Sequence, residues 1–312
     1  MNARQQPNYS QIISPEDYNQ IIGQHLFIRD ADLVIKRLVD WHGNEHRLSR
    51  PIEVVEFGCG PARILPLLSQ IENINLTGID HDRLFVEYAE RTIQQKHLNA
   101  KVILGDATSY VHPKPINIVV SQGFHHHIPK GEATQQYLQN VHHQLYRYGV
   151  YIVGDEFLPH YIDAEERLVR AVIWYFLIIW DALMRNMDKL AIEEAKTLLD
   201  DLAEGTQSHV IKTEAQIELV FESVTKMYDP VHPKKQWQMN QLARNFLKKL
   251  PSLQTTTVPN DTSMDLSRGD FKICHRVFQD EVTQAGFTII GVTNIGPIET
   301  FGGLVVYVLQ KI

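Results

Sequence analysis

The chain has 312 residues, 44% of them hydrophobic, which is enough to bury a full core in one large domain or two smaller ones. Its net charge of −7 and its lack of any block of Lys and Arg argue against a nucleic-acid partner and favour a small molecule. Two cysteines cannot form a disulfide framework, and the first residues lack an apolar signal core, so we expect a cytoplasmic protein.

Helical patterns come first along the chain. Apolar residues recur at helical spacing between residues 9 and 47, which predicts about two helices before the first strand. These helices either cover one face of a sheet or form part of a cap over a substrate. The pattern leaves both roles open.

A glycine-rich loop between a strand and a helix is the central feature of the sequence. Val54, Val55 and Phe57, with the acidic Glu56 between them, lead into Gly58 and Gly60, and helical spacing follows at 63–68. Glycines let the backbone turn sharply and approach a ligand closely, and the first N–H groups of the helix face the same place. This order predicts a site for a nucleotide-like cofactor. Arg63 stands at the third glycine of the dinucleotide fingerprint, which disfavours a nicotinamide cofactor.

Two further strands end near acidic residues. Residues 74–80 form an apolar strand that ends at Asp80, about 20 residues after the first glycine. An acid at this place can accept hydrogen bonds from both ribose hydroxyls of an adenosine. An amphipathic helix at 82–91 returns the chain to a third strand at 101–104, which precedes Asp106. A turn-forming aspartate is the alternative at both acidic positions.

Three consecutive histidines follow a fourth strand at 116–124. Because adjacent side chains in a loop rarely bind one ion together, and no spacing here is typical of a metal site, we predict no metal. Either His125 or His126 faces a substrate as hydrogen-bond donor or base, or these histidines are structural. The other metal ligands considered were His142, His143, His160, Asp155 and Glu156.

A helix at 131–146 and a turn at 147–149 lead to a fifth strand at 150–156. A helical insert follows, from about residue 160 to residue 270. Asp163 and Glu166 form a capping box, and the apolar window after them is interrupted by Arg170 and is too short for a membrane span of ~20 residues. We therefore expect a buried or lid helix.

The rest of the insert is predicted to contain a charged helix, a helix starting at Thr213, and a polar loop at 251–269. Because the insert leaves the sheet at the carboxyl end of a strand, we expect it to roof the substrate pocket. The pattern then resumes with a helix at 271–285. Two strands at 286–292 and 303–309 complete the sheet.

Glu56, Gly58, Gly60 and Ala62 resemble motif I of the class I S-adenosyl-L-methionine (SAM)-dependent methyltransferases, with Ala62 in place of a third glycine. The order of strands, the histidine turn and the Ala-Gly-Phe step into the sixth strand are similar too. The resemblance covers 49–160 and 271–312. It implies an α/β fold with a doubly wound, seven-stranded and mostly parallel sheet whose last strand is antiparallel, preceded by helices and carrying a large helical insert between strands five and six.

The resemblance also implies a cofactor and a set of site residues. The cofactor is SAM, and the residues expected to bind it are Glu56, Gly58, Cys59, Gly60, Asp80, His81, Asp106, Ala107, Ser121 and Gln122. A catalytic base is needed only if the acceptor must lose a proton. The candidates for that base, in no order, are His125, His126, Glu156 and His160.

Four segments follow from this interpretation: an N-terminal helical cap at 1–48, a SAM-binding core at 49–160, a lid or substrate insert at 161–270, and completion of the core at 271–312. Insert residues Trp174, Tyr175 and Trp180, together with Arg167, Arg170 and Arg185, favour a small, partly apolar acceptor with an anionic group. The acceptor atom stays undetermined. The alternatives are a non-catalytic SAM-binding assembly protein and, less favoured, a nicotinamide-dependent oxidoreductase, and a homodimer is left open.

Overall fold

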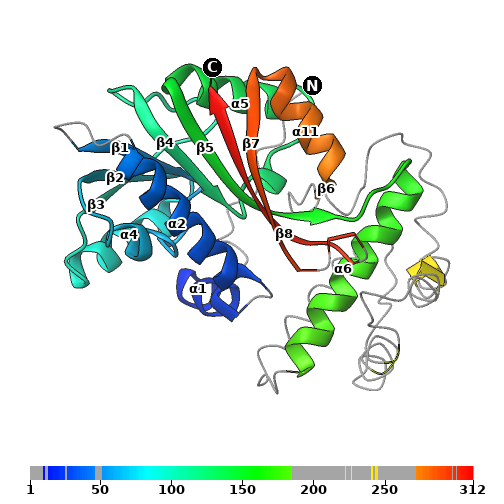
Figure 1. Cartoon of the computed structure of the whole chain (residues 1–312). Helices are drawn as coiled ribbons and strands as arrows, with labels where there is room; N and C mark the ends of the chain where they lie inside the picture. The colour runs from blue at the N-terminus through cyan, green and yellow to red at the C-terminus, as the bar shows by residue number, and fades with distance from the viewer. Residues whose placement is uncertain are drawn as a thin grey trace, which may run out of the picture. The chain divides into compact units, whose positions relative to one another are not determined.

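The computed structural model describes residues 10, 13–24, 27–45, 51–184, 222, 226, 240–241, 243–244, 272–296, 298–299 and 301–311 (Figure 1). The chain divides into two compact units. The first comprises Met1–Glu156, Arg276–Ile295 and Leu304–Ile312, and the second comprises Phe157–His275 and Gly296–Gly303.

The first unit is built on a twisted sheet with the order β3-β2-β1-β4-β5-β8-β7. Neighbouring strands among the first five are parallel, whereas β7 and β8 are antiparallel to each other. The doubly wound sheet predicted from the sequence is therefore confirmed, and a short eighth strand, β6 (Ile273–Cys274), pairs with β5 in addition to the seven strands expected. The other strands are β1 (Ile52–Phe57), β2 (Ile74–Asp80), β3 (Ala100–Leu104), β4 (Ile116–Gln122), β5 (Leu145–Leu158), β7 (Phe287–Ile295) and β8 (Gly303–Lys311).

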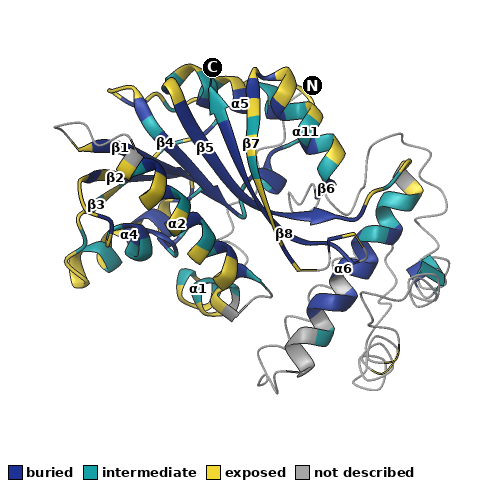
Figure 2. Cartoon of the chain, viewed as in Figure 1, coloured by how far each residue is buried: buried dark blue, intermediate teal, exposed yellow. Residues whose placement is uncertain are grey.

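Strand order reverses between β1 and β4, and ligands of open α/β sheets bind beyond the carboxyl ends of the strands at such a point. Both faces of the sheet are covered, as a parallel sheet requires. All six residues of β1 are buried, and the central strands are dark in Figure 2 while the outer sides of the helices are exposed.

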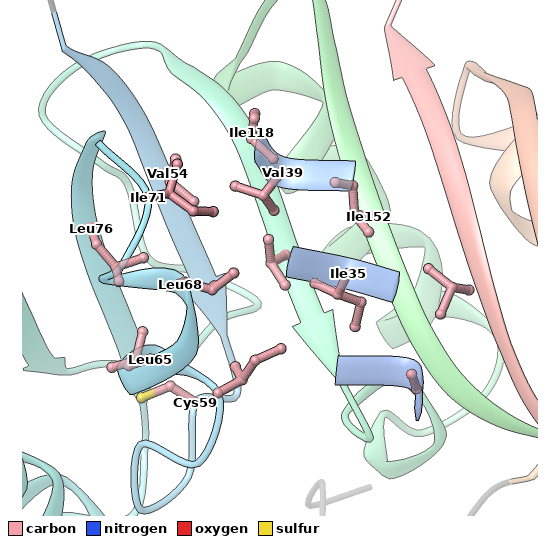
Figure 3. Close-up of a cluster of buried hydrophobic side chains, with 14 of the residues drawn as sticks. Ile35, Val39, Val54, Cys59, Leu65, Leu68, Ile71, Leu76, Ile118 and Ile152 are labelled. Carbon is pink, nitrogen blue, oxygen red and sulfur yellow. The ribbon is translucent and has the colours of Figure 1, made fainter. Parts of the chain in front are cut away.

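The helices of the first unit are α1 (Pro15–Gln24), α2 (Ile28–Glu45), α3 (Leu65–Leu68), α4 (Arg83–Gln95), α5 (Glu132–Gln144) and α11 (His275–Gln284), with a 3-10 turn at His125–His127. Among the residues described before the first strand there are two α-helices, as predicted. Ile35 and Val39 of α2 join Val54, Ile118 and Ile152 of the sheet in one buried cluster (Figure 3). The opposite face carries α5, whose Tyr137 packs edge-on against Phe57 and Tyr151.

Alternation along the strands assigns side chains to these two faces. Residues two apart in a strand share a face, so Glu56 lies on the α2 side with Val54, and Gln122 lies there with Val120. Ser121 lies on the α5 side, where its hydroxyl is 2.7 Å from the Tyr151 hydroxyl. The polar residues at the strand ends are thus sorted onto opposite sides of the sheet.

Two boundaries differ from the sequence interpretation. The fifth strand begins at Leu145 and includes the predicted turn, where Tyr148 has a φ of 65° and the pairing with β4 shifts between Ile116 and Ile118. The chain therefore bends inside the strand. The predicted helix at 271–285 was wrong at its start, because β6 (Ile273–Cys274) pairs with the end of β5 before α11 begins.

In the second unit, α6 (Ala164–Met184) starts at the predicted cap. Asp163 Oδ1 accepts a hydrogen bond from Glu166 N at 2.8 Å, and Glu166 Oε2 accepts one from Ile162 N at 3.0 Å. Trp174 of this helix is fully buried. No helix within the described parts of the chain is long and apolar enough to cross a membrane. The helix expected at Thr213 and the loop expected at 251–269 lie outside the described residues.

The glycine loop contains one strained residue. Gly58 and Gly60 have φ values of 69° and 52°, and Ala62, at the third motif position, has a φ of 63°. A left-handed conformation places Cβ close to the following carbonyl oxygen, which costs an alanine about 1–2 kcal/mol and a glycine nothing.

Replacing Ala62 by glycine should therefore increase the free energy of unfolding by about 1 kcal/mol, as measured by urea denaturation. The matched control is Ala89→Gly in α4, where the helical backbone should make glycine destabilising by about 1 kcal/mol. Equal losses of stability in both variants would contradict the strain assigned to Ala62.

Candidate functional site

Backbone hydrogen bonds tie the glycine loop to the end of β2. Gly58 N and Cys59 N both donate to Ile79 O, at 2.9 and 3.1 Å, and Gly60 N donates to Asp80 Oδ2 at 2.8 Å. The Cys59 side chain belongs to the buried cluster on the α2 side, where a Cβ on Gly78 would lie 2.8 Å from its sulfur. Burial raises the pKa of this thiol. Of Cys59, only the backbone is placed to face a ligand.

Gly58 has a second structural requirement that the sequence did not indicate. A Cβ at this position would lie 2.1 Å from Phe124 Cδ2, so the aromatic ring lies directly against the Gly58 backbone. Phe124 immediately precedes the histidine turn. The lack of a side chain at Gly58 thus allows the loop after β4 to pack against it, and it also allows the turn itself.

Asp80 lies at the carboxyl end of β2, as predicted, and is 8% exposed. Its Oδ2 accepts from Gly60 N, and its Oδ1 accepts from Asp82 N at 2.9 Å. Burial raises the pKa of Asp80, while these two hydrogen bonds oppose the increase. His81 is exposed beside it. The Asp80 carboxylate also holds the glycine loop. Contact of Asp80 with a ribose stays a prediction.

Asp106 and Ala107 follow β3. Asp106 is exposed, and its Oδ1 accepts from Thr108 N at 2.8 Å and from the Thr108 hydroxyl at 2.7 Å, which is the turn role left open above. Ala107 is buried, and its carbonyl accepts from Asn140 Nδ2 at 3.1 Å. Their contact with an adenine stays a prediction.

On the α2 side of the sheet, polar groups replace the apolar cluster at the carboxyl ends of the strands. Glu56 is 2% exposed, and Oε2 of its carboxyl group has no hydrogen-bond partner among the described residues. Gln122 is 6% exposed, and the same holds for both polar atoms of its amide. Buried polar atoms are normally paired, so these atoms need donors and acceptors from a ligand or from water.

Three residues absent from the sequence prediction join this group. Arg63 hydrogen-bonds to Asp32 of α2, and both act on the pKa of Glu56. Tyr18 of α1 packs its ring 5.1 Å from that of Phe85. Burial raises the pKa of Tyr18 to about 12, and the charges of Arg63 and Asp80 act on the same hydroxyl. A tyrosine or an aspartate within an amphipathic helix carries no sequence signal for such a role.

The first two histidines of the turn have different environments. The His125 ring is buried, stands edge-on to Phe278 at 4.9 Å, and places Nε2 3.0 Å from Glu281 Oε2. This is the environment of a structural histidine. His126 instead hydrogen-bonds through Nδ1 to Asp155 Oδ1, and its backbone N donates to Asp155 Oδ2 at 3.1 Å.

Asp155 is completely buried beneath His126. Burial raises the pKa of Asp155, but the charge and hydrogen bond of His126 outweigh burial and bring this pKa well below its usual range. Glu156, the next residue, donates its backbone N–H to Asp155 Oδ1 at 2.6 Å. By strand alternation the Glu156 side chain belongs to the α2 side. The two acidic residues at the end of β5 therefore serve different faces.

His160 belongs to the second unit and is exposed. Its Nδ1 is 4.0 Å from Cys274 Sγ, and its carbonyl accepts from Arg170 Nε at 3.2 Å. The other three base candidates belong to the first unit. Within the described residues, no group of three or more His, Cys, Asp or Glu side chains could hold a metal ion.

Residues 54–149 match a family model described as a methyltransferase domain, a segment that runs from β1 into β5. No curated protein matches the chain.

Solved structures similar to the chain include the [4+2]-cyclase SpnF, at 10% identity and a TM-score of 0.47 over 88% of this chain and 80% of that one. Geranyl diphosphate C-methyltransferase from Streptomyces coelicolor A3(2) is similar at 6% identity and a TM-score of 0.45, over 88% of this chain and 79% of that one. The cyclopropane synthase MmaA2 from Mycobacterium tuberculosis is similar at 9% identity and a TM-score of 0.47, over 88% of this chain and 83% of that one. At these values no substrate carries over to this chain.

Acidification should destabilise the fold through His125. Burial lowers the pKa of His125 in the folded chain. Below about pH 6.5 the unfolded chain therefore binds a proton at this histidine more readily than the folded chain does, which favours unfolding. This contribution to stability is present above that pH and is lost as the pH falls toward the folded-state pKa. Burial shifts the pKa of His112 and His142 in the same direction.

We expect the midpoint temperature of thermal unfolding to decrease as the pH is lowered from about 7.5 to about 5.5. The decrease should be smaller in His125→Gln. The control is His143→Gln, whose side chain is exposed and which should keep the wild-type slope. An unchanged slope in His125→Gln would show that His125 does not contribute.

Asp80→Asn should weaken SAM binding by about tenfold or more, because a charge-assisted hydrogen bond contributes on the order of 1.5–3 kcal/mol. Asparagine retains an oxygen that can accept from Gly60 N, so the loop should survive. Calorimetric titration with SAM measures the affinity. Wild-type affinity in this variant, with an unchanged unfolding midpoint, would remove Asp80 from the cofactor site.

Proposed function

We propose that this chain, a class I SAM-dependent methyltransferase by its matched domain and its strand order, transfers the methyl group to a small, partly apolar molecule. The observation that carries the proposal is the set of buried, unpartnered polar atoms of Glu56 and Gln122, beside the glycine loop within the matched segment. They fit the ammonium and carboxylate groups of the amino-acid end of SAM.

The small size of the acceptor is supported by charge. A net charge of −7 opposes binding to phosphate polymers. The aromatic residues of the insert give less support than the sequence suggested, because Trp174 is part of the buried core of the second unit. Arg170, proposed for an anionic group, donates to Glu166 Oε1 at 2.7 Å and to Asn240 Oδ1 at 2.7 Å. The acceptor class therefore rests on charge more than on these side chains.

When bound, SAM supplies an electrophilic methyl group. Transfer to the acceptor is an in-line displacement, so the protein acts mainly by holding two molecules in line. Asp80 and the polar groups on the α2 side hold the cofactor. Rate then depends on how rigidly these side chains are held, and the hydrogen bonds from Asp80 to Gly60 and Asp82 fix the first of them.

Where the acceptor must lose a proton, His126 is the best-oriented base. Asp155 binds Nδ1, which fixes the ring and assigns proton transfer to Nε2. The lowered pKa of Asp155 keeps that carboxylate ionised near neutral pH, where it stabilises a protonated His126. The buried contacts of His125 with Glu281 and Phe278 favour a structural role for that ring.

The alternative is a SAM-binding protein that assembles with partners and does not catalyse. Incubation with SAM and a panel of phenols, amines and carboxylates, followed by detection of S-adenosyl-L-homocysteine, separates the two. Product formation with a small acceptor supports the enzyme. SAM binding without product from any acceptor would favour the assembly protein, and binding of a nicotinamide cofactor in place of SAM would favour the oxidoreductase. Cytoplasmic location and a homodimer stay predictions.

With an acceptor that loses a proton, His126→Asn should lower kcat by on the order of 10²–10⁴, the usual contribution of a general base. SAM affinity should change little, because His126 lies on the face opposite Glu56. The exposed His143→Gln serves as control and should keep the wild-type kcat. A wild-type kcat in His126→Asn would assign proton removal to another group.

A further inference from the structure

The polar groups on the α2 side form a defined layer, made of Tyr18, Asp32, Glu56, Arg63, Gln122 and Glu156, which we call the polar layer. Its strand residues follow the apolar cluster by strand alternation, with Glu56 after Val54 and Gln122 after Val120. Asp32 stands one helical turn before Ile35 on α2. All members belong to the first unit.

Charge in the polar layer is unbalanced. Arg63 is its cation, and it is hydrogen-bonded to Asp32. Glu56 is left facing the charges of Asp32 and Asp80, while Glu156 acts electrostatically on Tyr18. Burying several carboxylates around one arginine is costly unless one of them holds a proton. Asp32 Oδ1 is also buried without a hydrogen-bond partner among the described residues, but the other oxygen of Asp32 is bonded to Arg63. Glu56, at 2% exposure and with an unpartnered Oε2, is therefore the carboxyl group best placed to hold the proton.

We propose that the polar layer is a proton-linked site for the amino-acid end of the cofactor, in which the ligand's ammonium group replaces a proton held by Glu56. The inference rests on the proposed function, since it takes the polar layer to face SAM. Gln122 has an amide oxygen and an amide nitrogen, both unpartnered, that can accept from the ammonium and donate to the ligand's carboxylate.

The balance of the step is simple. In the free protein the Glu56 carboxylic acid keeps its proton, and on binding it becomes a carboxylate paired with the ammonium, so that one proton passes to solvent. Burial raises the pKa of Glu56 well above its usual range, Arg63 opposes the increase, and Asp32 and Asp80 add to it. The buried Cys59 thiol and the Tyr18 hydroxyl, whose pKa values are also raised by burial, stay neutral throughout. Affinity should therefore rise with pH.

Calorimetric titration in two buffers of different ionisation enthalpy measures the protons released on binding. Between about pH 6 and 7, below the α-amino pKa of about 7.7–8.0, SAM and S-adenosyl-L-homocysteine should each release up to about one proton. Their affinities should rise by up to about tenfold per pH unit. The probe 5′-methylthioadenosine, which carries the ribose but no amino acid, should release none by this route, and any contribution of Asp80 is common to all three ligands.

Two variants assign the proton. Glu56→Gln should abolish the difference in proton release between SAM and 5′-methylthioadenosine. Asp32→Asn should reduce it, because it removes a repelling charge and the partner of Arg63. Glu53→Gln is the matched control on the same strand. Its carboxylate is bonded elsewhere, to Lys114 and Asn75, and proton release should stay at the wild-type value.

The outcomes separate this inference from the proposed function. SAM binding without excess proton release would overturn the inference and leave the methyltransferase proposal standing. No binding of SAM would overturn both. Release with SAM but not with S-adenosyl-L-homocysteine would place the sulfonium at Glu56 and contradict the assignment to the ammonium. If Glu56→Gln fails to fold, Asp32→Asn decides, since unchanged release there contradicts the charge balance of the polar layer.

Discussion

The two hydrogen bonds accepted by Asp80 hold the site together. One oxygen fixes Gly60 of the glycine loop, and the other fixes Asp82. Asp82 in turn caps α4 and accepts from the backbone and hydroxyl of Ser10 at 2.8 and 2.7 Å. Three segments distant in sequence are therefore positioned by two buried carboxylates. A residue proposed to bind ribose is also a structural support, so its two roles have to be separated by measurement.

The sheet separates the residues proposed to hold the cofactor from the residue proposed to move a proton. Glu56 and Gln122 lie on the α2 side, and His126 with Asp155 lies by the α5 side, yet all of them stand at the same ends of parallel strands. Because β4 and β5 are adjacent, both groups border one edge of the sheet. These two proposed groups of residues can thus be close without competing for the same contacts.

Much of the fold follows from local patterns. Continuous apolar runs predicted β1, β2 and β4, and apolar residues at helical spacing predicted the two N-terminal helices. These patterns exist because the buried sides of a strand or helix require apolar residues at regular positions in the sequence. Residues at the site were less predictable. His125 and His126 are neighbours in sequence, but the 3-10 turn directs one toward Glu281 and the other toward Asp155. The pairing of Arg63 with Asp32 depends on packing of α2 against the sheet, which no local pattern encodes.

The contact between Phe124 and Gly58 couples the position of the loop after β4 to that of the glycine loop. The aromatic ring lies against the backbone of the glycine loop, and the histidine turn begins at the next residue. A displacement of either loop has to be followed by the other, or the ring loses its packing. A side chain at position 58 would therefore meet two obstacles, the left-handed φ of 69° and the Phe124 ring, and a smaller residue at position 124 would remove only the second.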